Sequence, residues 1–334
     1  MKPDWKTILI SRTDGIGDVV LTLPLVGALR VNFPNAKLVF IGLNYTEAVV
    51  ALSKHVDQFV NWDNVETSEK RTHLLESLRA DAIFHVFPEK TVVQAAYDAK
   101  IPARIGTGRR WHTWSRCNKR LWYGRKGSNL HESQLNLKML SAIGIKGFWP
   151  LAEEIHLYGI KAPFMSAKVH DLLSSGKAHI ILHPKSHGSA LEWGMDHFGK
   201  LASRLDADRF TIFITGTEKE RQAMDQEGGQ FPWEQKNVVD LSGKLTLPEL
   251  VELIAASDVL VAASTGPLHI AAALGIGAVG LYSPKRPIHP VRWAPLGTRA
   301  RTLSSEEHPQ DGVLDISVDS VLAEIEDLMK GSKK

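Results

Sequence analysis

Short apolar segments alternate with helix-like segments along both halves of the chain, and this alternation constrains the fold most. In the first half the strand-like segments are 7–11, 37–41, 58–60 and 82–86, separated by helical patterns at 19–31, 44–52 and 68–79. In the second half the strand-like segments are 179–183, 210–215, 238–241, 259–262 and 278–282, with helical patterns at 195–205, 218–227, 247–256 and 268–274. Such alternation predicts an α/β fold, with parallel sheets covered by helices on both faces.

The segment FWPLAEEIHLYGIKAPF, residues 148–164, is rich in proline and aromatic residues and reads as a linker. We therefore expect two doubly wound, Rossmann-like domains, 1–160 and 161–334, which face each other. The amphipathic last helix, 317–330, is free in this scheme to pack back on the N-terminal domain. Ligands of such folds bind at the carboxyl ends of strands, so a central cleft is the expected site.

Composition narrows the class of protein. The 334 residues are 43% hydrophobic and 23% charged, as in a globular protein with sizeable cores. The net charge is only +3, so the chain as a whole is not a polyanion binder. The single cysteine, Cys117, excludes an internal disulfide framework and fits a reducing compartment. The most apolar long window, 259–282, contains four glycines and Pro267, which argues against a membrane span. We expect a cytoplasmic protein without a signal peptide.

The turn DGIGD, residues 14–18, follows the first strand. Its glycines, Gly15 and Gly17, do not complete a dinucleotide-binding G-x-G-x-x-G, because Val20 holds the third position. Asp18 has two interpretations. It is either an ordinary helix-start charge or a carboxylate at the edge of the sheet that acts as a general base.

A second group lies in AASTGPLHIAAALG, residues 262–275, where a strand ends and a helix begins. Ser264, Thr265 and Gly266 form an anion-binding corner suited to a diphosphate, and His269 lies in the first helical turn. The alternative is a buried helix with a satisfied histidine.

Two further polar segments follow strands. HPKSHGSALEW, residues 183–193, offers Lys185 and His187 to phosphate or hydroxyl groups, and Ser186 is a further candidate for donor binding. ITGTEKER, residues 214–221, carries Glu218, which is either a ligand of ribose hydroxyls or a helix-start charge.

The run RIGTGRRWHTWSRCNKRLWYGRKG, residues 104–127, contains eight Arg or Lys, three Trp and no acid. Such a segment can bind nucleic acid, an anionic membrane face or a phosphorylated glycolipid. The alternative is a solvated loop anchored by its tryptophans. The candidate binding residues in this run are Arg109, Arg110, Arg116, Lys119 and Arg120.

Metal-binding and hydrolase motifs are missing from the sequence. There is no H-E-x-x-H, no close His/Cys cluster, no strand-ending Asp-x-Asp and no G-x-S-x-G. We therefore expect neither a metal nor another cofactor.

Together these segments resemble the ADP-heptose:lipopolysaccharide heptosyltransferases, glycosyltransferase family 9. The resemblance rests on SRTDGIGDVVLTLPLVGALRVNFPNAKLVFIG, on HPKSHGSALEW and on NVVDLSGKLTLPELVELIAASDVLVAASTGPLHIAAALG, in the family's order. It implies a GT-B fold with an acceptor domain followed by a nucleotide-sugar domain, and inverting, metal-independent transfer from ADP-heptose.

The same resemblance implies roles for individual residues. Asp18 matches the acid that deprotonates the acceptor hydroxyl. Thr265, Gly266 and His269 match the donor-phosphate corner, and Glu218 matches the acid at the donor's ribose. The glycines of the first turn and the basic segment fall on the acceptor side, which implies an anionic glycolipid acceptor, peripheral contact with the cytoplasmic face of the inner membrane, and no nucleic acid.

Two departures from the family pattern leave the donor sugar open. A lysine usually stands shortly before the tryptophan of the second motif, where this chain has Ala190-Leu191-Glu192, and Lys185 is the candidate to supply its charge. An acid often precedes Thr-Gly in the third motif, where this chain has Ser264.

The remaining alternatives belong to other classes. They are a family-9 transferase with another nucleotide sugar and surface-glycan acceptor, a GT-B epimerase or hydrolase, and a binding protein without activity. An NAD-dependent oxidoreductase is disfavoured by the incomplete glycine motif.

Overall fold

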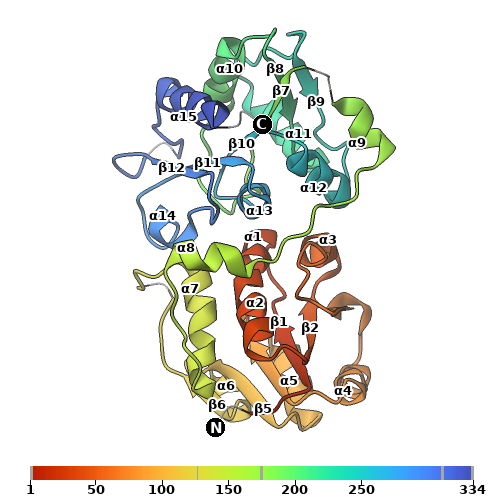
Figure 1. Ribbon diagram of the computed structural model, residues 1–334. Coiled ribbons are helices and arrows are strands. Elements are labelled where there is room, and N and C mark those ends of the chain that lie inside the picture. The colour runs from red at the N-terminus through yellow and green to blue at the C-terminus, as the bar shows by residue number, and fades with distance from the viewer. Residues whose placement is uncertain (1–2, 126, 174–175, 310–311, 332–334) are drawn as a thin grey trace. The chain divides into compact units, whose positions relative to one another are not determined.

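The chain forms two units, each built around one parallel β-sheet, in the computed structural model (Figure 1). Unit 1 is Met1–Lys161 and unit 2 is Ala162–Lys334. The structure describes residues 3–125, 127–173, 176–309 and 312–331. The division falls within the segment that the sequence suggests as a linker.

The helices and strands of unit 1, with η for 3-10 helices, follow one another along the chain. They are β1 (Thr7–Ser11), α1 (Ile16–Val20), α2 (Leu23–Asn32), β2 (Lys37–Gly42), η1 (Asn44–Thr46), α3 (Glu47–Val50), β3 (Gln58–Asn61), η2 (Trp62–Asn64), α4 (Ser68–Ser77), β4 (Ala82–His85), α5 (Lys90–Asp98), β5 (Ala103–Thr107), α6 (Trp111–Arg116), β6 (Lys119–Leu121), α7 (Glu132–Leu137), η3 (Lys138–Ile143), α8 (Leu151–Glu154) and η4 (Ile155–Leu157).

Unit 2 repeats the strand–helix alternation. Its elements are α9 (Ala167–Leu172), β7 (Ala178–His183), α10 (Met195–Arg204), β8 (Phe210–Ile214), α11 (Glu218–Glu227), β9 (Val238–Asp240), α12 (Leu247–Ala255), β10 (Val259–Ala263), α13 (Gly266–Leu274), β11 (Gly277–Tyr282), α14 (Pro290–Trp293), β12 (Ala300–Ser304) and α15 (Val318–Lys330).

The two sheets have the same strand order. Within the described residues, the first sheet runs β3-β2-β1-β4-β5-β6 and the second β9-β8-β7-β10-β11-β12, all parallel. The order reverses beside the first strand of each unit, between β1 and β4 and between β7 and β10. Doubly wound folds bind their ligands at such a switch point, and the loops at the carboxyl ends of these strands are called the crevice of each sheet below. The predicted α/β class with doubly wound sheets is confirmed.

Both faces of the first sheet are apolar because its central strands are continuous hydrophobic runs. Leu9 and Ile83 contribute to the core on the face covered by α4 and α5, whose Leu75 and Val92 join the same cluster. Each fully buried side chain of this kind contributes about 1.5–3 kcal/mol of transfer free energy. In Figure 1 these two helices lie together, and they are in contact.

The core of unit 2 has Trp193 at its centre, with none of its surface exposed. Its Nε1 donates to the carbonyl of Ile316 (2.8 Å). The last helix, α15, contributes Val321, Ile325 and Leu328 to the same core. The apolar face of α15 is thus buried within unit 2, so packing on the N-terminal domain is not needed to cover it.

The predicted helix 19–31 is two helices, α1 and α2. Pro24 lies in the first turn of α2, where its missing N–H is harmless. In the middle of a single helix over 19–31, the same residue would leave one carbonyl without its hydrogen bond. The chain therefore turns at Leu21 and Thr22, and the Thr22 hydroxyl donates to the carbonyl of Asp18 (2.8 Å).

Part of the predicted linker belongs to unit 1. The backbone of η4 packs on α2 so closely that a Cβ on Gly27 would lie 1.8 Å from the carbonyl oxygen of Leu157. Glu154 and Tyr158 are buried beside it. Residues 151–161 are therefore packed structure, and the connection between the units is shorter than the composition suggests.

Candidate functional site

The crevice of the first sheet begins where β1 and β4 end. The Ser11 hydroxyl and His85 Nδ1 lie 3.2 Å apart across the two strand ends. The chain then leaves β1 through residues 12–15 and enters α1 at Ile16. Burial of the strand forces the polar residues that follow it to the carboxyl edge, and Asp18 lies there in the first turn of α1.

Arg12 organises this edge. The residue is 3% exposed, and its guanidinium faces carboxylates on three sides. Nε donates to Asp14 Oδ1 (2.6 Å), Nη2 pairs with the Asp18 carboxylate, and Nη1 lies 3.5 Å from Glu132 Oε1. A planar guanidinium can hold several carboxylates at once in this way.

A second arginine, Arg125, approaches the same cluster from the loop after β6. It pairs with Glu132, donates to Asn136 Oδ1 (2.9 Å) and lies 3.3 Å from the carbonyl oxygen of Val86. Asn136 in turn donates to the carbonyl of Leu21 (2.9 Å). The cluster therefore ties α7 and the basic segment to the turn after β1.

The carboxyl groups in this cluster have altered acidity. Burial raises the pKa of Asp18; the Arg12 charge opposes this rise and the Glu132 charge adds to it. Burial also raises the pKa of Asp14, to about 6, against the opposing effect of Arg12. A carboxylate with a raised pKa is a better proton acceptor than an ordinary aspartate.

The glycines of the turn lie close to these groups. Gly15 precedes α1 and is exposed, and a Cβ there would lie 3.2 Å from Asp18 Oδ2. Any side chain at this position would crowd the carboxylate. Gly17 is half-buried in α1, next to Asp18.

The basic segment is folded structure, not a loop, because β5, α6 and β6 lie in it. Two of its candidate binding residues contact other parts of unit 1: the Arg110 guanidinium lies over the Phe87 ring (5.6 Å), and Arg116 binds Gln94. Arg120 donates to the carbonyl of Trp114 (2.9 Å) within the segment.

Arg109 and Lys119, the other two candidates in this segment, are exposed, as are Arg110 and Arg120. Trp111 and Trp122 are exposed as well, at 76% and 68%. The tryptophans therefore do not serve as buried anchors.

The crevice of the second sheet holds the predicted anion-binding corner. Thr265 precedes α13 but makes no side-chain capping bond, and its buried Oγ1 has no hydrogen-bond partner among the described residues. Gly266 begins the helix, and His269 is buried in its first turns, with its N–H 3.4 Å from the carbonyl oxygen of Thr265. Ser264 is half-buried at the strand end. The helix terminus thus offers N–H groups that the Thr265 side chain leaves uncapped.

The loop after β7 lies against this corner, since Ser189 Oγ is 3.5 Å from the carbonyl oxygen of Ser264. Lys185 Nζ binds Glu192 Oε2 (3.0 Å) and pairs with Glu227. Although burial lowers it, these two carboxylates raise the pKa of Lys185. Its charge is therefore balanced within the protein.

Ser186 also binds Glu192. Its backbone N–H and its hydroxyl lie 2.8 and 3.0 Å from Glu192 Oε1. Glu192 belongs to the Ala190-Leu191-Glu192 segment, where the sequence departs from the family pattern. Through Lys185 and Ser186 it holds in place the loop after β7, which the sequence predicts to bind the donor.

Glu218 begins α11 at the end of β8 and is exposed. The loops after β8 and β9 meet here, because Gly243 donates its N–H to the carbonyl of Gly216 (2.8 Å). Strand β7 lies between β10 and β8, so the ends of β10 and β8 are about 10 Å apart along the sheet edge. Glu218 and the α13 corner follow these two strands in the sequence.

Four members of the first cluster are not predicted from the sequence: Arg12, Asp14, Arg125 and Glu132. Arg12 lies just before the turn and Asp14 begins it. Polar residues after a strand are common, so the sequence alone does not single out these two. Glu132 lies 120 residues from Arg12 in the sequence. Only the fold brings them together.

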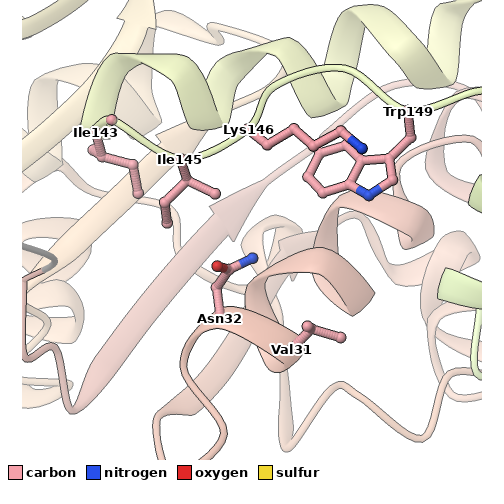
Figure 2. A pocket seen from close by; sticks show the side chains of 7 residues that line it. Val31, Asn32, Ile143, Ile145, Lys146 and Trp149 are labelled. Carbon is pink, nitrogen blue, oxygen red and sulfur yellow. The ribbon is translucent and has the colours of Figure 1, made fainter.

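A hollow of about 550 Å³ lies away from both crevices. It is lined by residues at the end of α2 and in the loop after η3, among them Asn32, Ile145 and Trp149. Figure 2 shows Lys146 beside the Trp149 ring. The Lys146 Nζ lies 5.4 Å from the centre of that ring. Helix α2 runs from the carboxyl ends of the strands back towards their amino ends. Its last residue, Asn32, therefore lies at the amino ends of the strands, whereas Asp18 lies at their carboxyl ends.

Two other kinds of feature are missing from the described residues. No group of three or more His, Cys, Asp or Glu side chains within them is arranged to hold a metal ion. No helix in the same residues combines the length and apolar character needed to cross a bilayer.

Comparison with known proteins places this geometry in context. The model of glycosyltransferase family 9 (heptosyltransferase) matches residues 126–314, more than half of the chain. Lipopolysaccharide heptosyltransferase 3 of Escherichia coli is 25% identical over 283 residues, 80% of each chain. Lipooligosaccharide heptosyltransferase 2 of Campylobacter jejuni is 25% identical over 282 residues, 84% of this chain and 82% of that protein.

Among solved structures, the ADP-heptose lipopolysaccharide heptosyltransferase II of E. coli is similar over 98% of this chain and 100% of that chain. Its TM-score is 0.76 at 21% identity. With the two doubly wound sheets, this likeness confirms the predicted GT-B fold.

Proposed function

The chain belongs to glycosyltransferase family 9, and from this premise we propose that it transfers a heptose from ADP-heptose to a sugar hydroxyl of a lipopolysaccharide core or related glycan. The transfer inverts the anomeric carbon and needs no metal. The relatives support these substrates, since one is described as a lipopolysaccharide heptosyltransferase and a solved neighbour as an ADP-heptose heptosyltransferase.

Asp18 is the general base in this proposal. The observation that carries it is the environment of this carboxylate, which lies at the switch point of the first sheet, with 26% of its side chain exposed and a raised pKa. It can therefore reach a substrate and accept a proton. The deprotonated acceptor hydroxyl attacks the anomeric carbon as the diphosphate leaves.

The donor's diphosphate binds at the start of α13 in unit 2. The uncapped N–H groups and the Thr265 hydroxyl, which has no partner among the described residues, support this assignment, because a helix N-terminus stabilises the negative charge that grows on the leaving group. His269 adds a donor, Ser264 lines the corner, and Glu218 holds the ribose hydroxyls. Lys185 and Ser186 shape the neighbouring loop.

The acceptor is an anionic glycolipid that binds unit 1. The exposed basic residues of the segment can meet its charged groups: Arg109, Arg110, Lys119 and Arg120. The exposed Trp111 and Trp122 support peripheral contact with the cytoplasmic face of the inner membrane. The contacts of three of the candidates hold the basic segment in its folded form: Arg110, Arg116 and Arg120.

A second candidate is a family-9 transferase that uses another nucleotide sugar and a surface-glycan acceptor. The specific observation in its favour concerns Lys185, the candidate to replace the lysine that usually stands shortly before the tryptophan of this motif. Its charge is balanced by Glu192 and Glu227.

A thermal-shift screen separates these candidates. The protein is heated with ADP, UDP, GDP and their sugar conjugates, with and without EDTA. Selective stabilisation by ADP and ADP-heptose is expected, unchanged by EDTA. Stabilisation by UDP or GDP instead would assign another donor. In a parallel transfer assay, loss of turnover in EDTA would exclude the metal-free mechanism.

Asp18→Asn tests the base. The substitution keeps the size of the side chain but removes its proton affinity, so transfer should fall by at least about 100-fold while ADP affinity stays unchanged. Transfer rates and calorimetric titration with ADP measure the two effects. Near-normal turnover of this variant would remove Asp18 from the role.

A further inference from the structure

The cluster around Asp18 contains more ionisable groups than a single base requires. Two guanidinium groups, Arg12 and Arg125, face the three carboxyl groups of Asp14, Asp18 and Glu132. Arginine stays protonated in proteins. The cluster therefore carries one net negative charge when all three carboxyl groups are ionised, and it is neutral when one of them holds a proton.

Two of the three carboxyl groups can exchange that proton with a substrate. The side chains of Asp14 and Asp18 are 23% and 26% exposed, whereas that of Glu132 is 1% exposed. Both aspartates bind the same guanidinium, Asp14 at Nε and Asp18 at Nη2. A change of charge on one must alter how strongly Arg12 holds the other.

We propose that Asp14 is a positioning residue for the transfer reaction: through the guanidinium of Arg12 it orients the Asp18 carboxylate, which takes the proton that leaves the acceptor. The proposal rests on the proposed function, because it needs Asp18 to be the base. It adds that Asp18 does not work alone.

The proton balance of the step is simple. The acceptor oxygen forms its bond to the anomeric carbon as the bond from that carbon to the phosphate oxygen breaks, and the bonding electrons leave with the diphosphate. The hydroxyl proton passes to an Asp18 oxygen, so the cluster changes from one net negative charge to none. The proton is then lost to water from the exposed side of the pair, and no co-reactant is consumed.

The groups that face the pair come from several elements, and each has a definite effect. Arg12 lowers the pKa of both aspartates, and Glu132 of α7 raises it. Arg125 lowers the pKa of Asp18. The Tyr45 hydroxyl of η1 donates to the backbone carbonyl of Asp14 (2.9 Å). Asp14 also responds to the charge of Asp18, which raises its pKa.

The test is the titration of Asp18 in two variants that should shift it in opposite directions. Asp14→Asn removes a like charge and leaves Arg12 to Asp18, so the Asp18 midpoint should fall by roughly one pH unit. Arg12→Lys keeps one positive charge but cannot hold both carboxylates in a fork, so the midpoint should rise.

The measurement is carboxyl-carbon NMR of the full-length chain labelled at aspartate, without substrate. The Asp18 signal is assigned by its loss in Asp18→Asn. The pH profile of transfer gives a second readout, and its acid limb should move with the Asp18 midpoint. A purely structural effect would lower the rate without shifting the limb in opposite directions.

Two further variants serve as controls. Asp63→Asn changes a carboxylate at the same sheet edge, which accepts the N–H of Asn44 (2.9 Å) and makes no described contact with Arg12, so the Asp18 midpoint should stay unchanged. Asp14→Glu keeps the charge and should restore the wild-type midpoint. If Asp14→Asn does not fold, Asp14→Glu and Arg12→Lys carry the test alone.

The outcomes separate this inference from the proposed function. An Asp18 midpoint that does not move in Asp14→Asn while transfer is retained, or that does not move in Arg12→Lys if Asp14→Asn does not fold, overturns the inference and leaves Asp18 as the base. Loss of transfer in Asp14→Asn as complete as in Asp18→Asn, with the Asp18 midpoint unmoved, also overturns it, because Asp14 would then be the base itself. Near-normal transfer by Asp18→Asn overturns the proposed function first.

Discussion

At the scale of single residues, burial alters the acidity of carboxyl groups outside the site as well. Glu154, at the end of α8, has no exposed surface, and burial raises its pKa from 4.5 to about 7, although the Ser133 hydroxyl works against the rise. The folded protein then binds a proton between pH 4.5 and 7 that the unfolded chain releases. The free energy of unfolding must therefore fall as the pH rises through this window.

Glu154→Gln should remove this pH dependence. The decline in unfolding free energy between about pH 5 and pH 8 should shrink by up to about 3 kcal/mol, because the variant has no proton to lose at this position. Urea denaturation at the two pH values measures it. Glu153→Gln, on the exposed side of the same helix, is the matched control, and an unchanged decline in Glu154→Gln would contradict the assignment.

The sequence could predict single site residues only where the local pattern marks them. Asp18 follows a buried strand and two glycines, so its place at the sheet edge is readable from the neighbouring residues. Its partners are not, because Glu132 comes from α7 and Arg125 from the loop after β6. Charges become a network only when distant segments are folded together.

At the scale of elements, the loop after β9 determines where Glu218 can lie. Gly243 has a φ of +73°, and a Cβ there would lie 2.3 Å from Glu218 Oε2. Only glycine relieves both the backbone strain and the contact. The start of α11 therefore depends on a residue from another loop.

Gly243→Ala should weaken ADP binding about tenfold by displacing the Glu218 carboxylate, a loss of about 1.4 kcal/mol. Calorimetric titration with ADP measures it. Gly228→Ala, at the other end of α11, is the control: Gly228 has a φ of +71°, but a Cβ there would meet no atom of the described residues within 4 Å. Equal loss of ADP affinity in both variants would show that backbone strain at the substituted glycine, not contact with Glu218, is responsible.

Which strands the sequence could predict follows from their burial. Central strands such as β1, β7 and β10 are continuous apolar runs and are recognisable. The strands β5, β6 and β12 are not recognisable in this way. Their sequences, ARIGT, KRL and ARTLS, contain charged residues and so lack a continuous apolar run. Strands near the edge of a sheet need less apolar surface, so their pattern resembles that of a loop.

At the scale of the whole molecule, each unit has its own sheet and its own crevice. If the donor binds as proposed, ADP should protect the loops after β7, β8 and β10 from hydrogen exchange and leave residues 12–18 unchanged. Exchange measured by mass spectrometry on the full chain tests this. Protection confined to unit 1 would reverse the assignment of donor and acceptor to the two units.

The shared strand order of the two sheets has a practical consequence for protein engineering. Since each crevice is made by the loops of one sheet, the chain can be cut between Lys161 and Ala162 and joined to the corresponding half of a relative without breaking a strand pairing. If the substrates bind as proposed, a hybrid of this kind would take its acceptor preference from the parent of unit 1 and its sugar preference from the parent of unit 2. The junction is therefore a natural point for building transferases with new combinations of substrates.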